Sequence, residues 1–230
     1  MEPDVLLALT ERAKSGGWQI KTATLLAYFH CLSSLCGHGV TVDVVSSGRS
    51  DRLSDPFHSL GLFWNFSPIH FATGDMPDPV ECGRLQALLL AASEHVMYPT
   101  ETLKAQGKAP PVWASFNYVH FHNMKSMDTP TGTGSAETLK VVHESDRFHH
   151  AMSLMVSLDK SATRATVMLC CNSANIDSAS MDRFLREYIA LVRRIAGLGA
   201  SVAGRDGLDH DQRSASTMTS DAPSLPRADS

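Results

Sequence analysis

The sequence lacks the features that mark membrane, secreted and nucleic-acid-binding proteins. Its 20 lysines and arginines are outnumbered by 24 aspartates and glutamates and form no basic stripe, so we expect no nucleic acid partner. Apolar runs such as residues 85–92 are far shorter than the ~20 residues of a membrane-spanning helix. The chain begins Met-Glu-Pro-Asp, without the basic start and apolar core of a signal peptide. We therefore expect a cytoplasmic protein without a membrane partner.

Cysteine is scarce and unpatterned. The sequence has 5 cysteines, an odd number, and no C-x-x-C pair, which argues against a disulfide framework and against a zinc or redox motif. No base is evident for a catalytic thiol. We interpret the cysteines as buried, reduced thiols: Cys31, Cys36, Cys82, Cys170 and Cys171.

The short motifs of self-sufficient enzymes are missing too. The sequence contains no G-x-S-x-G elbow, no G-x-x-x-x-G-K-[ST] phosphate loop and no G-x-G-x-x-G dinucleotide loop. Serines such as Ser46 and Ser47 have no recognisable triad around them. The sequence therefore offers no complete active site.

Histidine is plentiful, with 11 residues. His120 and His122 would share a strand face and could bind Zn²⁺ with a third ligand such as His143, but no cysteine or carboxylate lies at zinc-ligand spacing nearby, so we expect no metal site. His149 and His150 would point to opposite faces of a strand. His150 falls on a regular apolar face, which favours a satisfied, partly buried histidine over a catalytic one.

Hydrophobic periodicity predicts helices interspersed with strands. Helices are predicted over residues 6–14, 22–36, 79–96 and 181–196. The third starts most clearly, with Asp78 as N-cap, Pro79 at the first helical position and Glu81 closing a capping box. Strands are predicted over residues 40–45, 60–71, 112–122, 139–143, 148–158 and 163–171.

Two of these strands carry a burial prediction. Residues 60–71 are apolar and aromatic throughout, which is typical of a strand buried on both faces. The even-numbered residues of 148–158 should share one largely apolar face: Phe148, His150, Met152, Leu154, Val156 and Leu158. The fold class is therefore α/β (α+β): a mixed sheet of about six strands flanked by helices, over residues 1–202. Residues 203–230 have almost no large apolar side chains, which predicts a disordered tail.

Four short segments stand out in chain order. They are Ser47-Gly48-Arg49, residues 61–65 (GLFWN), residues 95–101 (HVMYPTE) and residues 111–118 (PVWASFNY). Together they resemble the C-terminal half, or lobe, of the condensation domain of nonribosomal peptide synthetases, in the chloramphenicol-acetyltransferase-like superfamily. That family carries S-G-R, G-x-F-V-N-T, H-Q-D-Y-P-F-E and P-x-x-x-V-x-F-N-[YF] in this order.

The sequence departs from the family in several places. Trp64-Asn65-Phe66 stands where the family has Val-Asn-Thr, and His70 replaces an arginine. The family's catalytic motif, H-H-x-x-x-D-G, does not occur. His149-His150 is no substitute, because Leu154 and Met155 stand where aspartate and glycine are required. The resemblance thus implies no catalytic residue in this chain.

The resemblance does imply residues near a substrate tunnel or in the family's motifs. It suggests that the amide of Asn65 holds adjacent backbone, that Arg49 pairs with a carboxylate of the other lobe, and that Tyr98-Pro99 fixes the exit from a helix. The full set is Ser47, Gly48, Arg49, Gly61, Phe63, Asn65, His95, Tyr98, Pro99, Glu101, Phe116 and Asn117.

The function that the resemblance implies is one half of an acyltransferase-type enzyme of secondary metabolite biosynthesis. A condensation domain forms an amide bond between a carrier-protein-bound thioester donor and an amine acceptor. Its substrates are attached to the phosphopantetheine group of carrier proteins. No directly bound cofactor is therefore expected. The expected partners are carrier (thiolation) domains and an N-terminal lobe with H-H-x-x-x-D-G, without which the chain should be inactive. Two alternatives stay open: an acyltransferase that uses a histidine such as His150, and a carrier-docking module without catalysis.

Overall fold

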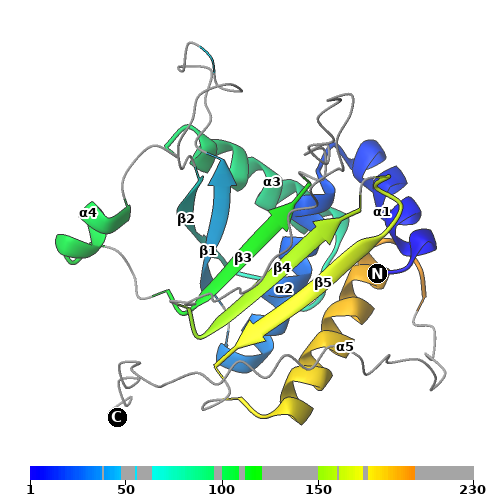
Figure 1. The fold of residues 1–230 in the computed structure, drawn as a ribbon. Helices are drawn as coiled ribbons and strands as arrows, with labels where there is room; N and C mark the ends of the chain where they lie inside the picture. Colours follow the sequence, from blue (N-terminus) through cyan, green and yellow to red (C-terminus); the bar gives the residue numbers. More distant parts are fainter. Residues whose placement is uncertain are drawn as a thin grey trace, which may run out of the picture. The chain divides into compact units, whose positions relative to one another are not determined.

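The structure is a computed structural model that describes residues 1–37, 39–47, 55, 64–95, 100–108, 112–120, 150–159, 161–172 and 176–199 (Figure 1). It contains one compact unit over Met1–Ala200. The tail predicted from residue 203 lies outside the described residues, as does the strand predicted over residues 139–143.

Within the described residues five strands form one mixed sheet, which agrees with the predicted fold class, although about six strands were predicted. They are β1 (Val40–Ser47), β2 (Trp64–Phe71), β3 (Ala114–Val119), β4 (Met152–Leu158) and β5 (Ala165–Cys171), in the order β2-β1-β3-β4-β5. The central strands β1, β3 and β4 run parallel, whereas β2 pairs antiparallel with β1 and β5 antiparallel with β4. Each parallel pairing joins segments far apart in the chain.

Five helices lie within the described residues. They are α1 (Pro3–Gly16), α2 (Ile20–Cys36), α3 (Pro79–Ser93), α4 (Thr100–Ala105) and α5 (Ser178–Ile195). The four predicted helices are confirmed, and α4 was not foreseen. Asp78 caps α3 by accepting a hydrogen bond from the Glu81 N–H at 2.8 Å. Gly17 ends α1 in a left-handed conformation (φ 71°), which glycine adopts without steric cost.

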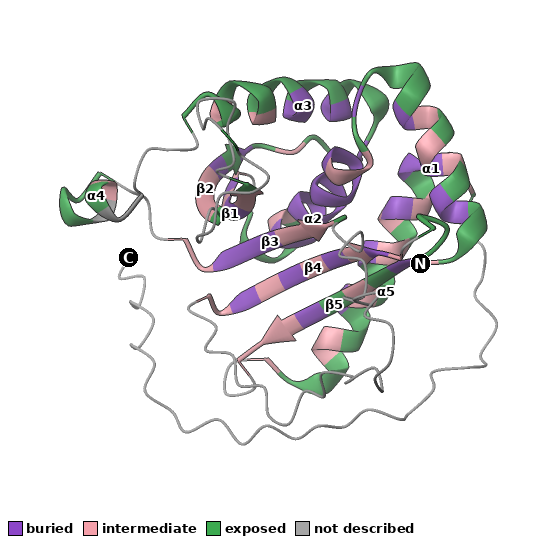
Figure 2. Ribbon diagram, turned by 45° about the horizontal axis from the view of Figure 1, so that its top comes forward, coloured by how far each residue is buried: buried purple, intermediate pink, exposed green. Residues whose placement is uncertain are grey.

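The helix α2 is the centre of the core. It contacts α1, α3 and α5 as well as β1, and every residue from Thr22 to Leu32 is buried (Figure 2). Its sequence predicts an apolar stripe, but the helix is enclosed on all sides because other helices flank it and the sheet covers it. Tyr28 packs on Phe116 of β3 and on Phe184 of α5, with ring centroids 6.1 and 6.0 Å apart.

The sheet presents one face to this helix layer. Met152, Leu154, Val156 and Leu158 of β4 are buried in alternation, which confirms the pattern predicted for that strand. The register places Phe116 of β3 beside Leu154 on the same face. Residues of the opposite parity, including Asp43 and Ser115, belong to the other face.

The prediction for residues 60–71 is wrong where the structure describes them. β2 is an edge strand with one neighbour, so only its Ile69 and Phe71 are buried, and Trp64 is 51% exposed. The cysteine prediction holds in part. Cys31 and Cys82 are buried, Cys170 and Cys171 are half-buried, and Cys36 at the end of α2 is exposed, all as free thiols. No helix in the described part of the chain is long and apolar enough to cross a membrane.

Candidate functional site

A buried carboxylate and histidine meet on the face of the sheet away from the helices. His150 Nε2 lies 2.8 Å from Asp43 Oδ2, and the two side chains are only 10% and 5% exposed. Asp43 is in the middle of β1, and His150 immediately precedes β4, on the far side of β3. The Phe66 ring stands edge-on to the imidazole, with centroids 5.1 Å apart at 60°. The prediction that His150 is partly buried and satisfied is confirmed, but the predicted face is wrong, because the side chain meets Asp43 on the face opposite to Met152 and Leu154. We call these residues the Asp43–His150 pair.

A row of hydroxyl groups continues from this pair across the sheet. The backbone register places Ser115 of β3 beside Asp43, and Ser153 of β4 beside Ser115. The two serine oxygens are 2.6 Å apart. Within the described residues neither hydroxyl is hydrogen-bonded to His150. The pair therefore has the geometry in which a carboxylate orients an imidazole, but no activated serine nucleophile is formed with it.

A pocket of about 360 Å³ opens where β1 ends. Its walls come from the start of α2, the end of β1, the middle of β2 and the second half of α3. We call it the β1 pocket and define it by Lys21, Ser46, Ser67, Ile69, Gln86 and Leu89. Ser46 and Ser67 approach each other at 3.2 Å between their hydroxyl oxygens. Burial lowers the pKa of the Lys21 ammonium, which donates a hydrogen bond to the carbonyl oxygen of Val45 at 3.3 Å.

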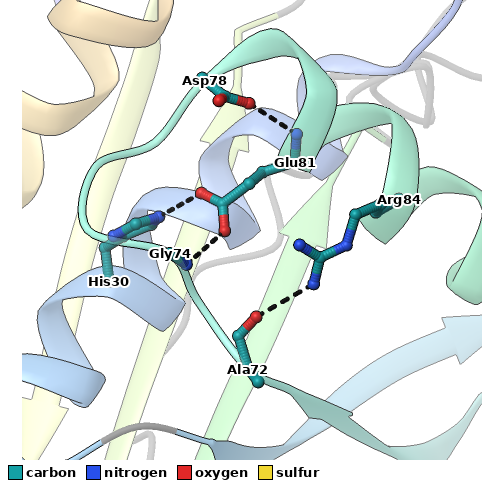
Figure 3. Close-up of polar contacts among 6 residues, drawn as sticks. All are labelled: His30, Ala72, Gly74, Asp78, Glu81 and Arg84. Carbon is teal, nitrogen blue, oxygen red and sulfur yellow. Dashed lines mark hydrogen bonds and ion pairs between the residues drawn. The ribbon is translucent and has the colours of Figure 1, made fainter.

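A second buried pair ties α2 to α3 (Figure 3). His30 Nε2 lies 2.7 Å from Glu81 Oε2, with 8% and 6% of the two side chains exposed. The other oxygen of Glu81 accepts a hydrogen bond from the Gly74 N–H at 2.6 Å. The predicted capping box is therefore wrong in its second half. Glu81 does not reach back to Asp78, because its carboxylate joins α2, α3 and the segment before α3.

The structure does not bring the predicted site residues together in one site. Ser47 and Asn65 lie together at one end of the β1–β2 pairing, where Ser47 is in register with Trp64 and Ser46 with Asn65. Ser47 also lines the β1 pocket. The side-chain oxygen Oδ1 of Asn65 accepts a hydrogen bond from the backbone N–H of Phe66 at 2.9 Å.

The remaining predicted residues do not join this group. Phe116 is fully buried in the core below Tyr28, and its neighbour Asn117 is half-buried on the opposite face. His95 is exposed just beyond α3, and Glu101 belongs to α4. The others lie outside the described residues: Gly48, Arg49, Gly61, Phe63, Tyr98 and Pro99.

The histidine pattern considered for zinc is only partly described. His120 is exposed just after β3, while His122 and His143 lie outside the described residues. The described part of the chain contains no group of three or more histidine, cysteine, aspartate or glutamate residues that could hold a metal ion.

Sequence reasoning missed Asp43 and Lys21. The signal for Asp43 was a lone carboxylate in the apolar run 40–45, where a buried charge requires a partner. Lys21 stands at the start of a strongly apolar helix, but its contact with the end of β1 depends on tertiary packing. Neither position is marked by any short motif.

No model of a protein family matches the sequence, and neither does any curated protein. Solved structures do match its fold. The condensation domain from the Monacolin K polyketide synthase MokA superposes with a TM-score of 0.68 over 86% of this chain and 46% of that one, at 18% identity. The four-domain nonribosomal peptide synthetase holo-AB3403, bound to AMP and glycine, matches with a TM-score of 0.67 over 85% of this chain and 16% of that one, at 16% identity.

The fold of the chain is thus that of part of a condensation domain, and the chain spans about half the length of the single domains it matches. The epimerization domain from the third module of tyrocidine synthetase B has the same fold, with a TM-score of 0.62 over 86% of this chain and 46% of that one, at 12% identity. One fold therefore serves more than one reaction among these structures, and the reaction has to be argued from the residues.

Proposed function

We propose that this chain is the C-terminal lobe of a condensation domain, acting in amide-bond formation in nonribosomal peptide biosynthesis. The observation that carries the proposal is the fold, which covers 86% of this chain and 46% of the MokA condensation domain. The order of the four sequence segments from Ser47 to Tyr118 supports it independently.

In this reaction the acceptor amine attacks the thioester carbonyl of the donor. The C–N bond forms, the C–S bond breaks, and the proton released by the amine ends on the phosphopantetheine thiol of the donor carrier. The histidine that assists the amine belongs to H-H-x-x-x-D-G, which does not occur in the 230 residues. This lobe would supply one wall of the substrate tunnel and part of the carrier-docking surface.

The partners follow from the same proposal. They are two carrier domains, which bring the substrates on phosphopantetheine, and an N-terminal lobe that brings the histidine motif. We place the complex in the cytoplasm, where carrier-bound thioesters are made. No directly bound cofactor is needed for the transfer itself.

The test is a single-turnover assay with two carrier domains, one charged with a donor aminoacyl group and one with an acceptor. Mass spectrometry of the acceptor carrier reports the new amide. The chain alone should give no product, and joining it to an N-terminal lobe with H-H-x-x-x-D-G should give product. Amide formation by the chain alone would overturn the proposal. Failure of the joined lobes to form any amide, with carrier binding intact, would instead favour a docking module without catalysis.

The Asp43–His150 pair favours a second candidate, an acyltransferase that uses His150 as its base. The carboxylate at 2.8 Å fixes the ring, and both side chains are shielded from water. The same assay decides between the candidates, because this one predicts thioester turnover by the chain alone. His150→Ala should then abolish that turnover, while His95→Ala, at an exposed histidine, should not. Turnover that His150→Ala leaves unchanged rejects this candidate.

A further inference from the structure

The β1 pocket is rich in hydrogen-bond donors, and the described part of its lining contains no carboxylate. Among the described residues that line it, Lys21 is the one cation and no aspartate or glutamate appears. Within the described residues the Lys21 ammonium donates to the Val45 carbonyl oxygen alone, which leaves two of its N–H bonds for a ligand. No ion pair to Lys21 forms within the described residues. Lys21 is half-buried at the mouth of the pocket, and no carboxylate of the described residues lies beside its ammonium.

Gln86 presents a second donor to the same space. Its carbonyl oxygen accepts from the Gln19 N–H at 3.1 Å and from the Thr22 hydroxyl at 2.5 Å, and these bonds fix the start of α2. These two donors identify the oxygen end of the Gln86 amide. The NH₂ group is therefore the part of the amide that takes no part in these two hydrogen bonds. It has no hydrogen-bond partner within the described residues, and it belongs to a side chain that lines the β1 pocket.

The rest of the lining is divided between hydroxyl groups and aliphatic side chains. Ser46 and Ser67 add two hydroxyls beside β1 and β2. Val44, Ile69 and Leu89 form an apolar wall. The volume of about 360 Å³ is within the range of small-molecule sites. One positive charge, neutral donors and an apolar wall together match a ligand with a single negative charge and a short hydrocarbon body.

We propose that the β1 pocket binds a short-chain carboxylate, with its carboxylate held by Lys21 and the Gln86 NH₂ group and its hydrocarbon chain on Ile69 and Leu89. The bound anion replaces the water that burial removes from the ammonium, so the ligand stabilises the charged form of the lysine. A phosphate monoester, with a second negative charge, would exceed the one cation in the lining. The site is separate from the Asp43–His150 pair, which lies on the other face of the sheet, and it does not depend on the condensation proposal.

Hexanoate is the probe, followed by the backbone amide signals of the full chain in an NMR titration. We expect saturable binding with a Kd of about 1 mM or tighter, with the largest shifts at Ser46, Ser67, Gln86 and Leu89. Hexan-1-ol, which has the same chain without the charge, should give no saturable shifts. Hexyl phosphate tests the dianion. Binding of hexyl phosphate more tightly than hexanoate would overturn the assignment to a carboxylate.

Two variants and one control test the residues. Lys21→Met keeps the aliphatic stem and removes the charge, and it should weaken hexanoate binding at least about tenfold. Gln86→Glu keeps an oxygen for Gln19 and Thr22 but places a negative charge in the pocket, so it should also abolish binding even if Lys21→Met fails to fold. Lys14→Met, at an exposed lysine in the last turn of α1, should bind as the unmodified chain does. Unchanged binding by Lys21→Met or Gln86→Glu, or no saturable shift at all, would overturn the proposal.

Discussion

His150 Nε2 and Asp43 Oδ2 are 2.8 Å apart although 107 residues separate them in the sequence. The contact passes over β3, because Asp43 belongs to β1 and His150 precedes β4. It therefore links the two strands that flank the centre of the sheet. Both side chains are almost inaccessible to water, so each depends on the other for its hydrogen bond.

The first prediction concerns this pair. Asp43→Ala should lower the free energy of unfolding by about 3 kcal/mol, because it leaves a buried imidazole without its partner. His150→Ala should have an effect of similar size, and the double variant should cost less than the sum of the two. Urea unfolding followed by circular dichroism measures all three. Strict additivity of the two substitutions would show that the contact does not form, and His95→Ala should change stability by no more than about 0.5 kcal/mol.

The second prediction concerns Glu81, which holds His30 and the Gly74 N–H (Figure 3). Glu81→Ala removes both bonds and should cost about 3 kcal/mol of unfolding free energy. Glu81→Gln keeps an oxygen for Gly74 and should cost about half as much. Chemical denaturation is again the measurement, and Glu94→Ala, at an exposed residue after α3, is the matched control. Equal costs for the alanine and glutamine variants would contradict the double role of the carboxylate.

The third prediction is a pH dependence that Lys21 imposes on stability. Burial lowers the pKa of Lys21 in the folded chain below 10.5. Between the folded pKa and 10.5 the unfolded chain binds more protons, so the free energy of unfolding should rise with pH across that window. Below the folded pKa both states are protonated, and the destabilisation by the buried charge is fully present.

Lys21→Met should remove this component. Unfolding curves at several pH values between 7 and about 10.5, compared between the variant and the unmodified chain, isolate it from other groups that titrate there. A difference between the two proteins that does not change over this range would contradict the prediction.

The fourth prediction concerns thiol reactivity. Burial, followed by the charges of Glu81 and Asp78, raises the pKa of Cys82 to about 12. Burial also raises the pKa of Cys31. Because the thiolate is the reactive form, both should resist iodoacetamide at pH 8 in the native protein, while the exposed Cys36 reacts first. Peptide mass spectrometry identifies the modified sites. Cys36→Ser should lack the fastest reaction, and labelling of Cys31 or Cys82 at the rate of Cys36 would contradict the structure.

Much of the fold could be predicted from local patterns. The cap at Asp78 and the alternation along β4 each depend on residues close in sequence, and each is confirmed. The spacing of Leu85 and Leu88 predicts that both lie on the apolar face of α3, and this is only partly confirmed. Leu85 is buried as its spacing predicts, but Leu88 is 37% exposed because the helix contacts its neighbours through Glu81, Cys82 and Gln86 instead. Buried polar residues displaced the leucine from the expected face.

The site could not be predicted in the same way. The aromatic run over residues 60–71 predicts a strand that is buried on both faces. In the sheet, however, β2 is an edge strand. The position of a strand in a sheet cannot be read from the sequence of that strand alone. The partners of Asp43 and Glu81 are 107 and 51 residues away, so neither contact has a local signature. Lys21 becomes part of a pocket only once α2 lies against β1 and α3. Phe116, singled out as a motif residue, is in the core because the parity of β3 turns it toward Tyr28.

The insertion of β3 between β1 and β4 has a consequence for how the chain folds during synthesis. After β1 and β2 have left the ribosome, the edge of β1 that pairs with β3 has no partner until residues 114–119 emerge. The edge of β3 that pairs with β4 then has no partner until residues 152–158 emerge. Nascent chains would thus expose a hydrogen-bonding edge rich in valine for much of translation. We expect chaperones to bind chains arrested before residue 150, and release to follow once β4 completes the centre of the sheet.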